Sequence, residues 1–428
     1  QWCHGEENNI VYTLAKDLDV LSPSINSYDA FQCYSPTLSL DKEIMEQIYV
    51  IADNIVNDVE VLESSKENFG DYFSKRFTAK VTEEFGNECS PELINALLEW
   101  IHKFHACLNA CPTWYDLSAK GILEYQSCEG NYYLQWRNKG YKTIIDILMK
   151  KFPYFQKAIP INDKIILNKV VTKIKLNKFD DIIVLCEDGS SYNAKKVLVT
   201  LPLGVLKQMK ESLFEPQLPL NKLKAIDGLG FGTVNKMFLK FPVQWWLKDP
   251  KGISIIWSER DSAFALENFH HGPTQNRKSW LENIFGFYPI DSHSNMLLVW
   301  VVGLDVNKIG CISDDILISG LLFVLRYFVG SRYPDIPNPI SILSSNWHLD
   351  PYAYGSYSYR SMMSEKMNVF ASDLESPVNI NGRPVLMFAG EATSSHQYST
   401  VHGAISSGFR EADRIINMFE KIEPKGKL

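Results

Sequence analysis

The first part of the chain carries apolar residues at helical spacing. Between Asp41 and Leu62 an apolar residue recurs about every fourth position, which predicts an amphipathic, acidic helix with a solvated face. The run Ser90-Pro91-Glu92 provides a cap, a first-turn proline and a first-turn acid, so another helix is predicted to begin there and to continue through Phe104. A shorter helical stripe is formed by Val11 to Leu18.

From Lys164 to Pro202 the pattern changes to one typical of β-structure. Apolar runs at Ile165–Ile174, Ile182–Leu185 and Lys196–Thr200 predict strands, with a turn at Asp188-Gly189. The later predicted elements are strands at Met237–Phe241 and Leu297–Val302 and a helix from Asp314 to Phe328 that ends at Gly330.

The C-terminal region predicts a strand, a tight turn and a helix. Val385–Ala389 is a buried-strand run that meets Gly390-Glu391, and a helix is predicted to begin near Val401 after a polar loop. This order is typical of an α/β nucleotide-binding layer. Helical and β regions alternate along the chain, so we expect a mixed α/β fold with two domains, each built from non-contiguous segments.

Charge and cysteine usage narrow the functional classes. The net charge of −7 argues against a nucleic-acid partner, which normally requires a basic surface. Eight scattered cysteines and the absence of an Asn-x-Ser/Thr site favour a reducing compartment. The apolar run Met296–Leu304 is far shorter than the ~20 residues of a membrane span. Gly426-Lys427-Leu428 is similar to a peroxisomal signal, so a cytoplasmic or peroxisomal location is expected; secretion stays open because the chain starts at Gln1 without a methionine.

Candidate chemistry gathers at Phe388–Thr393 and Tyr398–Ala404. Gly390 at the end of a strand lets backbone approach a ligand, and the Glu391 carboxylate can hold ribose or ribityl hydroxyls. The amides at the start of the helix near Val401 would face an electron-rich group. Lys236 lies in a predicted strand and shares a face with Val234 and Phe238. By itself such a lysine is usually an edge-strand charge.

Other patterns are interpreted as structural. Gly228–Gly232 is similar to part of a dinucleotide-binding loop, but it precedes a strand instead of a helix, so a turn is predicted. His102 and His105 point to a different side of their helix from Cys107 and Cys111, so no metal site is predicted there. His270-His271 lies in a polar loop without ligand partners.

The segment from Phe388 to Ala404 resembles the C-terminal signature of flavin amine oxidases, especially the polyamine oxidases. Further segments resemble that family in the same order: Gln1–Gly5 with its Trp-x-His-Gly element, Leu167–Val171, Val199–Leu206, Thr233–Phe241 and Asn346–Tyr359. The resemblance implies a two-domain enzyme with an FAD-binding domain from residues 1–28, 130–215 and 375–428. It also implies a substrate-binding domain from 29–129 and 216–374.

The resemblance assigns roles to individual residues. It implies that Lys236 organises a water at flavin N5 and that His4 lies beside the flavin and the amine chain. Cofactor-binding residues are expected at Glu391, Val401, Val171, Trp347, Gly390 and Thr200. Substrate-binding residues are expected at Val234, Tyr354, Tyr357, Tyr398 and Thr400. The implied reaction transfers a hydride from a spermine, spermidine or acetylated substrate to FAD, and oxygen becomes hydrogen peroxide.

Two departures from the family keep alternatives open. The GxGxxG loop that would hold the dinucleotide is expected to precede Gln1. The helical stretch Ala106–Pro112 has no carboxylate where polyamine oxidases hold a distal ammonium, and Asp116 or Glu124 are possible substitutes. An oxidase of another amine, or a non-catalytic amine-binding protein, is therefore the alternative hypothesis. Oligomeric state is not predicted.

Overall fold

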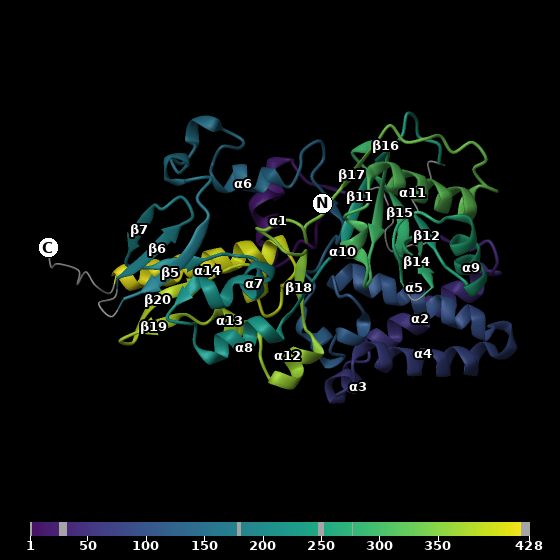
Figure 1. Ribbon diagram of the computed structural model, residues 1–428, viewed down its shortest axis with the longest axis horizontal. Helices are drawn as coiled ribbons and strands as arrows, with labels where there is room; N and C mark the ends of the chain where they lie inside the picture. The colour runs from purple at the N-terminus through teal and green to yellow at the C-terminus, as the bar shows by residue number, and fades with distance from the viewer. Residues whose placement is uncertain (1, 25–31, 178–180, 247–251, 276, 421–428) are drawn as a thin grey trace.

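The computed structural model describes residues 2–24, 32–177, 181–246, 252–275 and 277–420. Figure 1 shows two groups of elements side by side. One contains strands β5 to β7, β19 and β20 with helices α7, α8, α13 and α14. The other contains a large sheet that rests on helices α2, α4 and α5. The chain passes between the groups several times, as the interleaved sequence pattern predicts.

The large sheet has six strands in the order β17-β11-β16-β15-β12-β3, antiparallel except where β12 meets β3. Their bounds are Ser341–Ser344, Asn235–Lys240, His293–Val301, Ile284–Ile290, Ile253–Ile255 and Gln32–Tyr34. Met237 and Leu239 alternate onto the face that packs against helices α9 (Glu259–Asn268) and α11 (Asp314–Val329). Lys236 and its partner Trp300 therefore lie on the opposite face, toward the helical layer.

The helical layer consists of α2 (Lys42–Val56), α3 (Val59–Ser64), α4 (Phe69–Phe85) and α5 (Pro91–Asn109). Ser90 caps α5 as predicted, because its hydroxyl accepts a hydrogen bond from Leu93 N–H. The prediction of a single helix over residues 41–62 was wrong, because α2 ends at Val56 and a separate helix, α3, begins at Val59. Asp58 caps the new helix by accepting from Val61 N–H, and the periodic Val59 is half exposed.

A three-stranded sheet has the order β19-β20-β8, with bounds Val378–Ile380, Arg383–Phe388 and Val197–Val199. β20 and β8 run parallel, so their carboxyl ends meet at one edge. Each strand leads into a helix, α7 (Leu203–Leu213) after β8 and α14 (Val401–Glu420) after β20. The strand-turn-helix arrangement predicted for the C-terminal region is confirmed.

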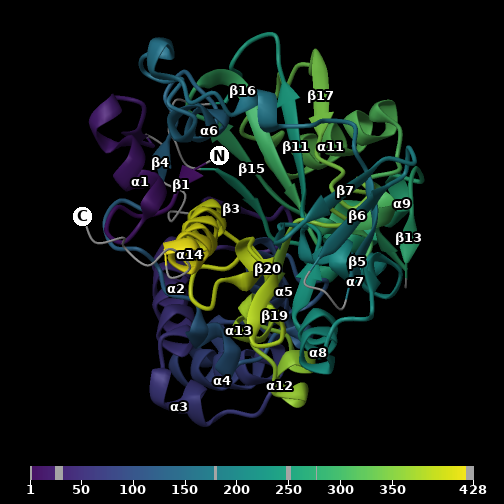
Figure 2. The same cartoon turned by 90° about the vertical axis from the view of Figure 1, so that its left-hand side faces the viewer.

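Smaller elements complete this half. The sheet β7-β6-β5-β9 is formed by Ser191–Ala194, Ile182–Cys186, Val171–Leu176 and Phe214–Glu215. Near the N-terminus, β1 (Trp2–Cys3), α1 (Ile10–Ala15), β2 (Ser22–Pro23), β4 (Leu134–Gln135) and α6 (Lys142–Leu148) enclose a small apolar core. That core includes Ile405 of α14, and Figure 2 shows α1 and α14 near each other. The remaining helices are α8 (Leu220–Gly228), α10 (Val306–Ile309), α12 (Met362–Met367) and α13 (Ala371–Glu375).

Two further predictions need correction. The strand predicted over Ile165–Ile174 begins only at Val171, because Asn168 has a left-handed φ of 57° and Leu167 is 76% exposed. Gly228–Gly232 is not a turn: it ends α8 and forms β10 (Gly230–Gly232), which pairs with β18 (Tyr357–Tyr359). A Cβ on Gly232 would collide with the Ala110 carbonyl, so close packing explains this glycine.

All eight cysteines are free thiols. Within the described ranges, no helix combines the length and apolar character needed to cross a bilayer. The same ranges contain no cluster of three or more histidine, cysteine or acidic residues arranged to hold a metal ion. The C-terminal residues Gly426–Leu428 lie outside the described residues.

Candidate active site

A cavity of about 350 Å³ lies where the parallel strands β8 and β20 end. Its wall contains Thr200 and Pro202 after β8, the stretch Phe388–Thr393 after β20, and Ala404 in the first turns of α14. The chain between β17 and β18 closes it with Trp347 and Gly355. In α/β proteins, ligands bind outside the carboxyl ends of parallel strands, where helix N-termini present free amides.

Glu391 provides the carboxylate of this cavity. Its Oε2 accepts hydrogen bonds from Ser358 Oγ at 2.7 Å and from Ser399 N–H at 2.6 Å. Burial raises the pKa of Glu391, and these two donors partly oppose the effect. Gly390 before it has φ +133°, and a Cβ there would meet nothing within 4 Å. The backbone at Gly390 is therefore open to a ligand, and its conformation requires glycine.

These features fit a flavin dinucleotide. Glu391 can accept from ligand hydroxyls, Gly390 leaves room for close approach, and the first turn of α14 offers backbone donors. Trp347 is half exposed on the cavity wall, so its ring is available to a planar ligand. The cavity brings together four predicted cofactor residues: Thr200, Trp347, Gly390 and Glu391.

Lys236 lies on β11, facing the helical layer. Its Nζ is 4.2 Å from the centroid of the Trp300 ring. Burial lowers the pKa of Lys236 to about 8, and the nearby Cys107 thiol opposes this slightly. This lysine is therefore still mostly charged at pH 7 but titrates just above it, which suits a group that exchanges protons with water or substrate. Val234, two residues earlier, is buried on the same side of the strand.

His4 is close enough to Lys236 and His402 for their charges to disfavour its protonation. Burial is the larger cause and lowers the pKa of His4 to about 4, so the ring is neutral at physiological pH. Its Nδ1 is 2.9 Å from the Tyr132 carbonyl, which can only accept, so Nδ1 carries the proton. The Nε2 of His4 is consequently left with an unprotonated lone pair.

Strand β18 connects the cavity to the lysine region. Ser358 donates to Glu391, while the Tyr357 hydroxyl donates to the Cys107 carbonyl at the end of α5. Ser399 Oγ in turn donates to the Ser358 carbonyl. Neighbouring residues of one strand thus face the predicted cofactor side and the predicted substrate side.

The remaining predicted residues are not part of the cavity wall. Tyr398 is buried and packs edge-on against Tyr125 with 5.5 Å between ring centroids. The Thr400 hydroxyl accepts from Gly403 N–H and donates to the Gln397 carbonyl, so it caps α14. Tyr354 is 38% exposed. Val171 begins β5 in the four-stranded sheet and does not line the cavity.

Val401 begins α14 and is 40% exposed, next to the buried His402. His402 was missed from the sequence; burial lowers its pKa to about 4, and Cys128 Sγ is 3.9 Å from its Nε2. Trp300 and Cys107 were missed as neighbours of Lys236. Only the register of β16 against β11 and the contact of α5 with the sheet bring them there.

The two proposed substitutes for the missing acid differ in their surroundings. Glu124 is 2.8 Å from Arg360 Nε, so a cation already neutralises it. Asp116 is half-buried and has no ion pair among the described residues; burial raises its pKa. Of the two, Asp116 is the carboxylate that remains available to an ammonium group.

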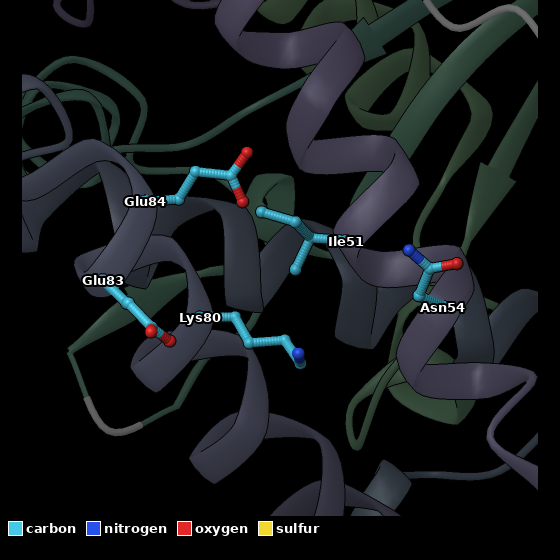
Figure 3. A pocket seen from close by; sticks show the side chains of 5 residues that line it. All are labelled: Ile51, Asn54, Lys80, Glu83 and Glu84. Carbon is cyan, nitrogen blue, oxygen red and sulfur yellow. The ribbon is translucent and has the colours of Figure 1, made fainter.

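Another cavity, of about 400 Å³, lies between α2 and α4 in the helical layer (Figure 3). Charged and polar side chains of the two helices line it together with Ile51: Asn54, Lys80, Glu83 and Glu84. None of the predicted site residues contributes to it. We therefore place the site at the strand ends.

Comparisons with known proteins agree with this geometry. The sequence pattern of the family described as flavin containing amine oxidoreductase matches residues 1–416. The peroxisomal N(1)-acetyl-spermine/spermidine oxidase of Bos taurus is 30% identical over 97% of this chain and 79% of the relative. The Homo sapiens protein of the same name is 29% identical over 98% and 84%.

Among solved structures, a double mutant of putrescine oxidase superposes with a TM-score of 0.66 over 97% of this chain and 87% of that chain. The identity is 13%, so this likeness concerns the fold alone, and it confirms the predicted mixed α/β, two-domain class. The chain therefore belongs to the flavin-containing amine oxidoreductase family, and it is an FAD-dependent amine oxidase.

Proposed function

We propose that this protein oxidises polyamines, namely spermine, spermidine or their acetylated forms, and that oxygen is reduced to hydrogen peroxide. The observation that carries the proposal is the closeness of neutral His4 both to Lys236 and to His402 of α14, the helix whose Ala404 lines the Glu391 cavity. The names of the two mammalian relatives, oxidases of acetylated spermine and spermidine, support the same substrate class.

Within this proposal the protein positions the amine and controls protons. His4 Nε2 accepts a hydrogen bond from the substrate nitrogen, because its lone pair is free and its neutral ring does not repel a cation. Lys236 holds the water that exchanges protons at the reacting centre. Val234, Tyr354, Tyr357, Tyr398 and Thr400 form the substrate wall.

The cofactor would be held by Glu391, Gly390, Thr200, Trp347 and the Val401 amide, with Val171 at the adenine end. When bound, FAD accepts the hydride from the carbon beside the amine and gives its electrons to oxygen. The domain division proposed above places most of these residues in the segments 130–215 and 375–428. We also propose a cytoplasmic or peroxisomal location, since the relatives' names carry the word peroxisomal.

A second candidate is oxidation of an amine that has no distal ammonium. It is favoured by the end of α5, which offers no negative charge to hold a distal ammonium. The titratable group there that influences Lys236 is the Cys107 thiol, and burial raises the pKa of that thiol, so it stays neutral. The paired state of Glu124 points the same way.

The full-length protein tests these alternatives through its absorption spectrum during anaerobic titration with spermine, spermidine and their N-acetyl forms. Flavin bands that bleach with these amines and return with air, releasing peroxide, support polyamine oxidation. Bands that bleach only with monoamines favour the second candidate. A protein that stays colourless after incubation with FAD, and shows no spectral change with any of these amines, would refute the proposed polyamine oxidation.

A further inference from the structure

The edge of β11 beside Lys236 is completed by two serine hydroxyls and the backbone N–H of Ser345, where strand β17 has already ended. β17 pairs with β11 only as far as Met237, which faces Ser344. Beyond that point the backbone N–H and C=O groups of Lys236, and of Val234 just before β11, face the segment that carries Ser345 and Ser356. Buried backbone groups need partners, so something else must satisfy them.

Ser345 satisfies Lys236. The Lys236 N–H donates to Ser345 Oγ at 2.9 Å, and Ser345 N–H donates to the Lys236 carbonyl at 2.9 Å. Ser356 satisfies Val234 in a similar way. The Val234 N–H donates to Ser356 Oγ at 3.0 Å, and that hydroxyl donates to the Val234 carbonyl at 3.2 Å.

The chain between these serines forms a closed loop over the cavity. The Trp347 carbonyl accepts from Gly355 N–H at 3.2 Å, which brings the two ends of the loop together. Ser356 N–H donates to the Gly232 carbonyl at 2.7 Å, so the loop is also tied to β10. Trp347, Gly355 and Ser356 all line the cavity. The loop is therefore anchored at one end to Lys236, through Ser345, and at the other end to Val234, through Ser356.

We infer that Ser345 and Ser356 are positioning residues, whose hydroxyls fix Lys236 and Trp347 in one rigid unit facing the flavin and the amine. The inference rests on the proposed function, because it explains how Lys236 and Trp347, two residues to which that function gives a role, keep a fixed position relative to each other. If β17 continued, its backbone would satisfy the same groups of Lys236 and Val234. The chain would then follow the sheet and would not form the loop that lines the cavity. The serines allow the chain to leave the six-stranded sheet at residue 345 and to contact Val234 at residue 356, just before it enters β18.

Loss of either hydroxyl leaves a backbone N–H without its acceptor. The end of the loop that has lost its hydroxyl should then detach from Lys236 or Val234 more often. Water then reaches the exposed backbone and the Lys236 ammonium. Cys107 on α5 influences the titration of Lys236, and Lys236 in turn influences that of His4 near β1. Neither changes in the serine variants, so a change in Lys236 titration would report its altered exposure to water.

Amide hydrogen exchange of the full-length protein tests the hydroxyl contacts without depending on activity. Ser345→Ala should speed exchange at Lys236 by about tenfold, and Ser356→Ala should do the same at Val234, the scale expected for one unsatisfied buried donor. Ser345→Thr keeps a hydroxyl and should restore slow exchange. Ser341→Ala is the matched control, because Ser341 is an exposed serine of β17 whose hydroxyl makes no hydrogen bond among the described residues.

A second readout separates positioning from simple stability. In Ser345→Ala, the apparent pKa in the pH profile of anaerobic flavin reduction should move upward from about 8, and the visible circular dichroism of the flavin should change. Unchanged exchange in both variants would overturn the inference. Faster exchange with an unchanged pH profile and unchanged flavin dichroism would also overturn it, because the hydroxyls would then be only structural. If no amine reduces the wild-type flavin, the proposed function fails, and exchange and dichroism still decide the role of the serines.

Discussion

Replacing Lys236 by methionine should separate stability from activity. The substitution keeps a long, flexible side chain but removes the buried ammonium and its contact with the Trp300 ring. Burial lowers the lysine pKa from 10.5 to about 8, and each unit corresponds to about 1.4 kcal/mol. At pH 7 the charged lysine therefore destabilises the folded state by about 3 kcal/mol relative to an unfolded chain.

The ring contact offsets part of this cost, by about 1–2 kcal/mol for a desolvated cation–π pair. Lys236→Met should thus raise stability at pH 7 by about 1–2 kcal/mol, or a few degrees in Tm. Between about pH 8 and pH 10.5 the unfolded wild-type chain binds more protons than the folded one, so wild-type stability rises with pH. The methionine variant lacks this term, and its advantage should fade across the same window.

Flavin reduction should fall by about a hundredfold in the same variant if Lys236 manages a proton at the reacting centre. Thermal unfolding at pH 7, 8.5 and 10 and stopped-flow reduction by the best amine substrate measure the two effects. Turnover within twofold of wild type would refute the catalytic role. A variant less stable than wild type at pH 7 would refute the electrostatic reasoning, since the buried charge would then be net favourable.

Three more outcomes are expected. Glu391→Gln should weaken FAD binding by about tenfold, measured by titrating apoprotein with FAD, because it replaces a carboxylate that accepts from Ser358 and Ser399. His4→Gln should raise KM without removing any titration between pH 5.5 and 7.5, since the pKa of His4 is about 4; a wild-type titration in that range that disappears in the variant would contradict this. Phe73→Ala should cost about 3–5 kcal/mol of stability in thermal or urea unfolding, because the ring is fully buried between α4 and α5.

Sequence periodicity predicted correctly those strands and helices whose apolar pattern lies within a short stretch of the chain. The apolar run before Gly390 and the amphipathic stretch after Val401 gave β20 and α14, because strand and helix periodicities differ there clearly. The same reasoning failed at residues 41–62, where a four-residue stripe continues through a break that Asp58 caps. It failed again at Ile165, whose apolar side chain is half exposed. Periodicity marks an apolar face but does not show what covers it.

The site itself depends on contacts between distant segments. The resemblance suggested Lys236 and His4, but the pairing of Lys236 with Trp300 follows from strand register, which spacing alone does not determine. The contact of Tyr357 with the end of α5 spans 250 positions. Serines at 345 and 356 look ordinary in the sequence, since only the end of β17 makes their hydroxyls necessary.

Burial shifts the titratable groups of this site toward their neutral forms. The pKa values of His4, His402 and Lys236 are lowered, and that of Glu391 is raised. Such a site binds a neutral amine at lower cost than an ammonium ion, because charge is expensive to desolvate there. Hydride leaves most readily from the carbon beside a nitrogen whose lone pair is free, so the surroundings that disfavour charge also favour the reactive form. The net charge of −7 favours the approach of cations, and under the proposed function the buried centre would favour those that release a proton on entry.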